Sequence, residues 1–126
     1  MTSFACPECK ANSLYIIHAI TLPPDSRSDD IILQIVACRR CKFRGVAIYE
    51  ESRRGGLDSE SWDHRGYRID AEEVDLLRQL IKACPETGNQ RCTCLSHRLL
   101  GTKNEYGRWE PPFESDWQRS FAMRRS

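Results

Sequence analysis

The placement of seven cysteines constrains this 126-residue chain more than any other feature of its sequence. Four of them form two C-x-x-C pairs, Cys6/Cys9 in "CPEC" and Cys38/Cys41 in "CRRC", with 28 residues between the pairs. A C-x-x-C turn points two sulfur atoms at one ion, and two such turns complete the tetrahedron of four thiolates that zinc prefers. We therefore predict a zinc site formed by Cys6, Cys9, Cys38 and Cys41.

The residues between the two pairs and after the second pair predict antiparallel strands. The stretches "SLYIIHAITL", "IILQIVA" and "VAIYEES" are rich in β-branched and aromatic residues, and the loop "PPDSRSDD" separates the first two. Two strands and their loop thus account for the spacing of the cysteine pairs. A thioredoxin-type redox role would require a βαβ setting, which this pattern does not predict. An iron site with the same four ligands stays open, because iron also binds thiolates.

Residues 6–52 resemble a zinc ribbon, with "CPEC" and "CRRC" as its two knuckles. The proline of the first knuckle and the glycine shortly after the second are both familiar from that superfamily. The resemblance implies a three-stranded antiparallel sheet with one bound zinc ion. It leaves the function open, because zinc ribbons occur in many unrelated contexts. The ribbon followed by a helix is also similar to the N-terminal module of zinc-ribbon antitoxins, but no helix-turn-helix pattern follows residue 83.

Residues 70–84, "DAEEVDLLRQLIKAC", form the clearest helical pattern in the chain. Asp70 and Glu73 have the spacing of a capping box, and Pro85 ends the pattern. Apolar residues recur along one side of this helix, which we expect to lie on the sheet. They are Val74, Leu76, Leu77, Leu80, Ile81 and Cys84.

The remaining three cysteines lie together in "CPETGNQRCTCLSH", which ends in a histidine. Three thiolates and one imidazole are a common ligand set for zinc. Cys84, Cys92, Cys94 and His97 therefore predict a second zinc site, and the expected total is two ions per chain. If residues 93–100 are helical, the last cysteine and the histidine share a face. Two alternatives stay open: Cys84 as a buried core thiol, and Cys92/Cys94 as a redox pair.

Together these patterns predict a small α+β fold that is held by metal. It consists of a three-stranded antiparallel zinc ribbon, one amphipathic helix and a second Cys/His zinc site. We expect the ribbon over residues 1–52, a connector over 53–69, and the helix with the second metal-binding segment over 70–101. Residues 102–126 form an aromatic-rich C-terminal segment. Its aromatic residues are too many for a solvated tail, so we expect it to pack on the rest in one compact unit or to face a partner.

The net charge, the first residues and the number of cysteines indicate which partners and which cellular compartment to expect. The formal net charge is +1, so the chain as a whole gives no argument for binding to nucleic acid or membranes. The start "MTSFACPECK" lacks the pattern of a secretory signal, and no stretch approaches the roughly 18 apolar residues of a membrane span. Since the number of cysteines is also odd, we expect a cytoplasmic protein whose reduced thiols are available for metal.

A local group of basic residues surrounds the second knuckle. It consists of Arg39, Arg40, Lys42 and Arg44. These cations could touch the phosphate groups of a nucleic acid. They could equally offset the negative charge that four thiolates leave around a zinc ion.

Neither a nucleophile motif nor a phosphate-binding loop is present in the sequence. Both predicted metal sites have four protein ligands, and closed sites of this kind are structural. We therefore expect a small zinc-binding protein without catalytic activity, which serves as a protein-interaction or regulatory module with a protein partner. One alternative is a nucleic-acid-associated regulator that uses the basic second knuckle. Another is a redox or metal-dependent enzyme centred on Cys92 and Cys94.

Overall fold

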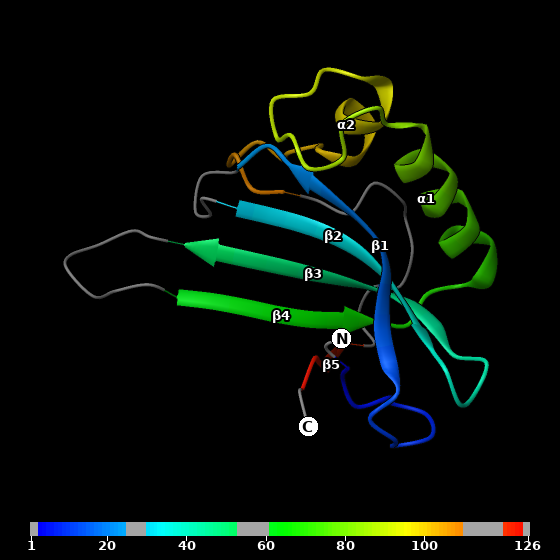
Figure 1. The fold of residues 1–126 in the computed structure, drawn as a ribbon. Helices are drawn as coiled ribbons and strands as arrows, with labels where there is room; N and C mark the ends of the chain where they lie inside the picture. Colours follow the sequence, from blue (N-terminus) through cyan, green and yellow to red (C-terminus); the bar gives the residue numbers. More distant parts are fainter. Residues whose placement is uncertain (1–2, 25–29, 53–60, 110–119, 125–126) are drawn as a thin grey trace.

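The computed structural model describes residues 3–24, 30–52, 61–109 and 120–124 (Figure 1). Within these residues, five strands form one antiparallel sheet in the order β1-β2-β3-β4-β5, so each strand pairs with the next along the chain. The strands are β1 (Leu14–Leu22), β2 (Asp30–Cys38), β3 (Arg44–Ser52), β4 (Ser61–Tyr67) and β5 (Ser120–Ala122). The same residues include the helices α1 (Ala71–Ala83) and α2 (Leu95–Leu100).

The sheet is larger than the predicted three-stranded ribbon. The three predicted strands are present, but the second half of the expected connector over residues 53–69 forms β4 instead, and β5 adds a fifth strand. Without β4, one edge of β3 would expose a row of backbone N–H and C=O groups that have no partner. The sequence of β4, "SWDHRGY", has no apolar alternation, which is why the pattern does not predict a strand there.

The main core lies between one face of the sheet and the helices. Helix α1 packs against β1, β2 and β3 on this face, and α2 lies near the C-terminal end of α1 (Figure 1). The core is apolar apart from one thiol, and burial of its side chains is the principal stabilising contribution. Its buried members are Ile20, Leu22, Ile31, Leu33, Ile35, Val46, Ile48, Val74, Leu77, Ile81, Cys84 and Leu100.

Helix α1 follows the predicted pattern with two corrections. The capping box is wrong, because the side chain of Asp70 makes no cap hydrogen bond; the first turn closes instead through the backbone, where the N–H of Val74 donates to the carbonyl of Asp70. Val74, Leu77 and Ile81 are buried as expected, but Leu76 is 45% exposed. Leu76 lies at the edge of the apolar side of the helix, which leaves its side chain partly uncovered.

A second core lies on the opposite face of the sheet, at the end that carries the cysteine pairs. It brings together the N-terminal segment, β2, β3 and the C-terminal residues 120–124. The N–H of Ala5 donates to the carbonyl of Arg124 at 2.8 Å, which joins the two ends of the chain at this point. The buried members of this core are Phe4, Cys6, Leu14, Val36, Ala47 and Met123.

The aromatic residues of the C-terminal segment have different environments. Trp109 packs against the main core, and Phe121 packs against the second core. Tyr106 is 75% exposed. Phe113 and Trp117 lie outside the described residues. In the described part of the chain, neither helix has the length and apolarity that crossing a membrane requires.

Candidate metal centres

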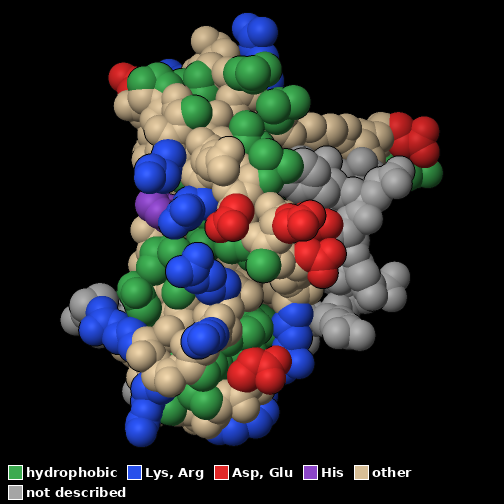
Figure 2. Space-filling view, turned by 90° about the vertical axis from the view of Figure 1, so that its right-hand side faces the viewer, with side chains coloured by type: hydrophobic (Ala, Val, Ile, Leu, Met, Phe, Trp, Pro, Cys, Tyr) green, Lys and Arg blue, Asp and Glu red, His purple; other side chains and the backbone are tan. Residues whose placement is uncertain are grey.

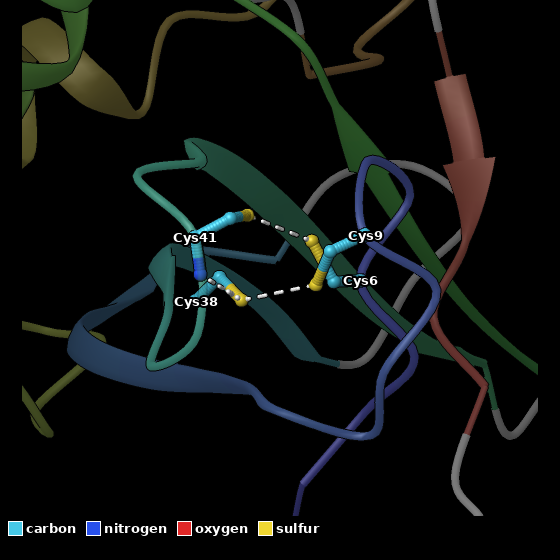
Figure 3. A group of neighbouring side chains, drawn as sticks. All are labelled: Cys6, Cys9, Cys38 and Cys41. Carbon is cyan, nitrogen blue, oxygen red and sulfur yellow. Dashed lines mark hydrogen bonds between the residues drawn. The ribbon is translucent and has the colours of Figure 1, made fainter.

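Cys6, Cys9, Cys38 and Cys41, here called site 1, converge from two separate turns (Figure 3). Their sulfur atoms all lie within 4.8 Å of one another, with 3.6 Å from Cys6 to Cys41 and 3.6 Å from Cys9 to Cys38. Four sulfurs at about 2.3 Å from one ion would lie about 3.8 Å apart. A disulfide is only about 2.05 Å long, and all four cysteines are free. The arrangement therefore fits a four-thiolate metal centre.

The two turns of site 1 close in the same way. In knuckle 1, from Cys6 to Ala11, the N–H of the first residue donates to the carbonyl of the last at 2.9 Å. In knuckle 2, from Cys38 to Phe43, the corresponding bond measures 3.0 Å. Lys10 of knuckle 1 has a φ of 66°, in the left-handed region that few side chains adopt. Two turns with the same closing hydrogen bond thus each direct two thiols toward a common point.

The electrostatics of site 1 favour a cation. Burial disfavours the thiolate of Cys38, but the hydroxyl of Ser13 and the N–H groups of Cys41 and Arg40 outweigh this effect and lower its pKa to about 6. At Cys41 the N–H of Phe43 favours the thiolate, yet burial and the neighbouring thiols raise the pKa to about 12. One thiolate forms readily and opposes the ionisation of the next. A bound divalent cation would remove this conflict.

Two contacts that support site 1 have no signal in the sequence. The hydroxyl of Ser13 lies 2.9 Å from the sulfur of Cys38. The guanidinium of Arg68 donates to the carbonyl of Pro7 at 3.3 Å and lies 3.1 Å from the carboxylate of Glu8, so it ties knuckle 1 to the end of β4. Both contacts join segments that are far apart in the chain, which local patterns do not encode.

Cys84, Cys92, Cys94 and His97, here called site 2, also converge. Their ligand atoms all lie within 4.8 Å of one another, and the sulfurs of Cys84 and Cys92 are 3.9 Å apart. The Nδ1 atom of His97 lies 3.2 Å from the sulfur of Cys84 and 3.3 Å from that of Cys94. Both His97 and Cys84 are buried. The four predicted residues thus form one cluster, and Cys84 is at the same time a member of the main core.

The imidazole of His97 is oriented by the edge of the sheet. Its Nε2 atom lies 2.9 Å from the carbonyl oxygen of Thr21 in β1. A carbonyl only accepts hydrogen bonds, so Nε2 carries the hydrogen and Nδ1 presents its lone pair to the three sulfurs. Metal-binding histidines characteristically donate their other N–H to an oxygen in this way. The N–H of Thr21 in turn donates to the carbonyl of Thr87, so the site 2 loop covers this edge of β1.

Cys94 and Cys84 of site 2 have opposed pKa values, as the thiols of site 1 do. Burial disfavours the thiolate of Cys94, but the backbone N–H and the ring of His97 outweigh it and lower the pKa to about 6. Burial and the neighbouring thiols raise the pKa of Cys84 to about 11. A cation between them would again favour the ionised form of both Cys84 and Cys94.

Helix α2 places two of the ligands of site 2. It begins at Leu95 rather than at Thr93, because the sulfur of Cys94 accepts the N–H of His97 and so caps the helix. Gly101 ends it, with its N–H donating to the carbonyl of His97 at 2.9 Å. A hollow of about 360 Å³ opens beside this helix. Its lining includes Cys92 and His97, so small molecules have access to this side of site 2.

The predicted basic residues lie around knuckle 2. Arg39, Arg40, Lys42 and Arg44 are all exposed. The guanidinium of Arg39 lies 4.5 Å from the centre of the Tyr15 ring, a cation–π contact.

Comparison of the chain with protein-family models, with curated proteins and with solved structures found no match. The likeness to a zinc ribbon therefore rests on the geometry of site 1 in this chain. The structure establishes a small α+β fold with a five-stranded antiparallel sheet and two cysteine-rich clusters that could each hold a metal ion.

Proposed function

We propose that this protein is a small zinc-binding module with two ions per chain, and that it acts by binding a partner protein rather than by catalysis. The observation that carries the proposal is the completeness of both ligand sets. Each site offers four ligand atoms from this chain within 4.8 Å of one another. A zinc ion bound by four protein ligands has no open position for water or substrate, so it serves the fold rather than a reaction.

Zinc is preferred over other metals because of the chemistry of the ligands. Site 1 offers only sulfur, and site 2 offers three sulfurs with one imidazole nitrogen. Such sets suit zinc in tetrahedral geometry, while magnesium and calcium require oxygen ligands. Iron is the competing metal at site 1, because it accepts the same four thiolates.

The test is the metal content of the full chain purified without added metal. We expect two zinc ions per chain and no visible absorption, because zinc has no electronic transitions in that range. Cys9→Ser and Cys92→Ser should each leave one ion, and the double variant should leave none. A coloured protein that contains iron would contradict zinc at site 1, and a single ion in the wild type would contradict site 2.

The redox alternative at Cys92 and Cys94 makes a different prediction. Cys92 borders the hollow beside site 2, so a small alkylating reagent can reach it. If the thiols are structural ligands, we expect them to react slowly until a chelator removes the metal. Fast modification of either cysteine while two ions stay bound would favour a reactive thiol and contradict the proposed structural role.

A second candidate function is binding to nucleic acid through the end of the sheet that carries site 1. Support comes from the exposed cations around both knuckles and from Arg124, whose backbone is bonded to the N-terminal segment. The acidic side chain nearest to them in sequence, Glu8, is paired with Arg68. Figure 2 shows many Lys and Arg side chains on the lower part of the molecule. The exposed cations are Lys10, Arg39, Arg40, Lys42, Arg44 and Arg124.

This candidate predicts salt-dependent binding. Arg39→Ala/Arg40→Ala/Lys42→Ala should weaken binding to single- or double-stranded DNA and RNA, and should reduce the dependence of log K on log salt by roughly 0.7 to 0.9 per lost phosphate contact. Arg91→Ala/Arg98→Ala/Lys103→Ala removes the same charge near site 2 and is the matched control. Equal effects of both triple variants would contradict a specific surface at knuckle 2.

A further inference from the structure

The hollow beside α2 lies between three segments that meet at site 2. It is bounded by Pro23 directly after β1, by residues 90–93 of the site 2 loop, and by residues of α2 together with Gly101. Figure 1 shows α2 and this loop beside the end of β1. The volume of about 360 Å³ lies at the low end of the range for pockets that bind small molecules. The hollow therefore has room for a group of the size of one amino-acid residue.

Two exposed arginines line the hollow, Arg91 in the loop and Arg98 in α2. In the parts of the chain that the structure describes, neither guanidinium forms an ion pair, and the lining of the hollow includes no acidic side chain. A guanidinium donates hydrogen bonds from a planar fork that matches two oxygen atoms of one anion. The pair of arginines therefore favours a ligand with a carboxylate or a phosphate group.

Site 2 determines where the two arginines lie. Arg91 directly precedes Cys92, and Arg98 directly follows His97, and both neighbours belong to the ligand set of site 2. The N–H of Arg98 also donates to the carbonyl of Cys94, a third member of that set, at 3.1 Å. An ion that binds these ligands thus keeps the two backbone positions together. In this respect the inference rests on the proposed function.

The net charge of this region indicates how much negative charge the hollow accepts. Three thiolates around one divalent ion leave a single negative charge at site 2. The two guanidiniums exceed this charge by one positive charge. A ligand group with one negative charge, such as a carboxylate, therefore balances the region. The dianion of a phosphate monoester would instead leave the region negative.

The amide of Gln90 indicates a second feature of the ligand. Gln90 lines the hollow, and its Oε1 atom is buried without a hydrogen-bond partner among the described residues. A buried acceptor that lacks a partner is unfavourable, so a ligand with an N–H donor would stabilise this amide. Rotation of the terminal amide brings the oxygen to the ligand, because this torsion is broad. The lining thus fits a carboxylate that has an N–H group close by.

We propose that the hollow binds the carboxyl terminus of a partner protein. The last residue of a chain carries one carboxylate and, on the same residue, one backbone N–H. Arg91 and Arg98 bind the carboxylate, and the amide oxygen of Gln90 accepts the N–H. An Asp or Glu side chain within a chain holds its carboxylate further from its own backbone N–H, so it fits the same lining less well.

The test is an NMR titration of the full chain with metal bound. The probes are acetylated tripeptides Gly-Gly-X with a free carboxylate, in which X is Ala, Val, Leu or Phe. We expect the backbone N–H signals of Thr93, Arg98 and Gly101 to shift with a millimolar Kd, because water screens the two exposed arginines. The same peptides with an amidated end should bind at least about tenfold more weakly, since they lack the charge. If no free-acid peptide shifts these signals at up to about 20 mM, the proposal is wrong.

Matched variants separate the hollow from the overall charge of the chain. Arg91→Gln/Arg98→Gln should raise the Kd of the tightest-binding peptide at least about tenfold. Gln90→Leu should raise it about three- to tenfold, the usual effect of one lost hydrogen bond. Arg39→Gln/Arg40→Gln removes the same charge around knuckle 2 and should leave the Kd unchanged. Equal weakening by the two double variants would overturn the proposal, because net charge alone would then attract the peptide.

Inorganic phosphate is the competing ligand, and it is titrated in the same way. If phosphate shifts the signals of the hollow at lower concentration than every free-acid peptide, the hollow is a phosphate site and the carboxyl terminus is the wrong ligand.

Metal content is measured on every sample, which separates this inference from the proposed function. Two ions per chain without peptide binding would overturn the carboxylate site and leave the zinc-binding module in place. Cys94→Ser should lose the site 2 ion while every residue that lines the hollow stays the same. We expect weaker peptide binding in this variant. A Kd equal to that of the wild type would overturn the role of site 2 in placing the two arginines.

Discussion

At the scale of single residues, His97 shows how one side chain joins a candidate metal centre to a sheet. Its Nε2 atom is bonded to the carbonyl of Thr21, and its Nδ1 atom faces two sulfurs at 3.2 and 3.3 Å. His64 also has a ring contact, with Nε2 2.7 Å from the amide oxygen of Gln34, but it belongs to neither of the two ligand groups. The two histidines therefore make a matched pair for mutation.

We predict that His97→Ala reduces the metal content from two ions per chain to one. The loss of one of four ligands should release the site 2 ion, while site 1 stays intact. His64→Ala should retain both ions. The measurement is metal content after exhaustive dialysis, and two ions in His97→Ala would contradict the assignment of its Nδ1 atom as a ligand.

His18 provides a prediction on pH. Its half-buried imidazole faces α1, where burial first and then the positive charges of Lys82 and Arg78 lower its pKa from the ordinary value of 6.5. The folded chain therefore favours neutral His18. The stability that this preference contributes is fully present above pH 6.5 and is lost as the pH falls from 6.5 toward the folded-state pKa.

The titration of His18 can be followed by NMR. We expect the ring proton signals of His18 to shift with a midpoint below 6.5. In Arg78→Gln/Lys82→Gln the midpoint should rise toward that value, because the two positive charges are removed while the burial stays. A wild-type midpoint at or above 6.5 would show that His18 is solvated rather than packed against α1.

At the scale of elements, the pairing of β4 with β5 depends on a glycine. Gly66 lies opposite Phe121 in the register of the two strands. A Cβ atom at Gly66 would collide with the ring of Phe121, which also packs edge-on against Phe43 of knuckle 2. The ring thus fills the space of the missing side chain and connects β5 to the site 1 end of the sheet.

We predict that Gly66→Ala destabilises the protein by about 1–3 kcal/mol, the usual cost of overpacking a filled space. Gly88→Ala is the control, because its Cβ would meet no atom within 4 Å. It should change the stability by less than about 0.5 kcal/mol. Denaturant unfolding of the metal-bound chains gives both values, and equal stabilities of the two variants would argue against the packing of Phe121 on Gly66.

At the scale of the whole molecule, the two candidate metal sites lie in different parts of the fold. Site 1 joins the N-terminal segment to the turn between β2 and β3, and it borders the second core. Site 2 joins α1, α2 and the edge of β1, and it borders the main core through Cys84. Structural zinc supplies roughly 10–16 kcal/mol of folding free energy in small modules, which is comparable to the whole stability of a typical domain, about 5–15 kcal/mol.

We predict that Cys38→Ser abolishes cooperative thermal unfolding, because the knuckles close the β1–β3 part of the sheet. Cys92→Ser should retain a cooperative transition at a lower Tm, since the sheet keeps its second core and its strand pairing. Calorimetry and circular dichroism on matched samples give the comparison. If Cys38→Ser unfolds as cooperatively as the wild type, site 1 does not hold the sheet together.

Sequence alone determined the ligand groups of the candidate sites, the first three strands and the first helix. The spacing of the cysteines limits which of them can meet at one point, and alternation or helical periodicity fixes where β2 and α1 form. These are short-range signals, carried by residues close together in the chain. For the same reason the apolar face of α1 was predictable, apart from Leu76 at its edge.

Only the tertiary structure decided the extent of the sheet and the environment of the sites. The strand β4 supplies backbone partners for the edge of β3, and β5 supplies them for β4, although the sequence of β4 does not favour a strand. The carbonyl that orients His97 belongs to Thr21, 76 residues away, and the hydroxyl beside Cys38 belongs to Ser13. A backbone carbonyl carries no side-chain signal, and Ser13 meets Cys38 only because distant parts of the chain come together, so no local pattern in the sequence could assign these partners.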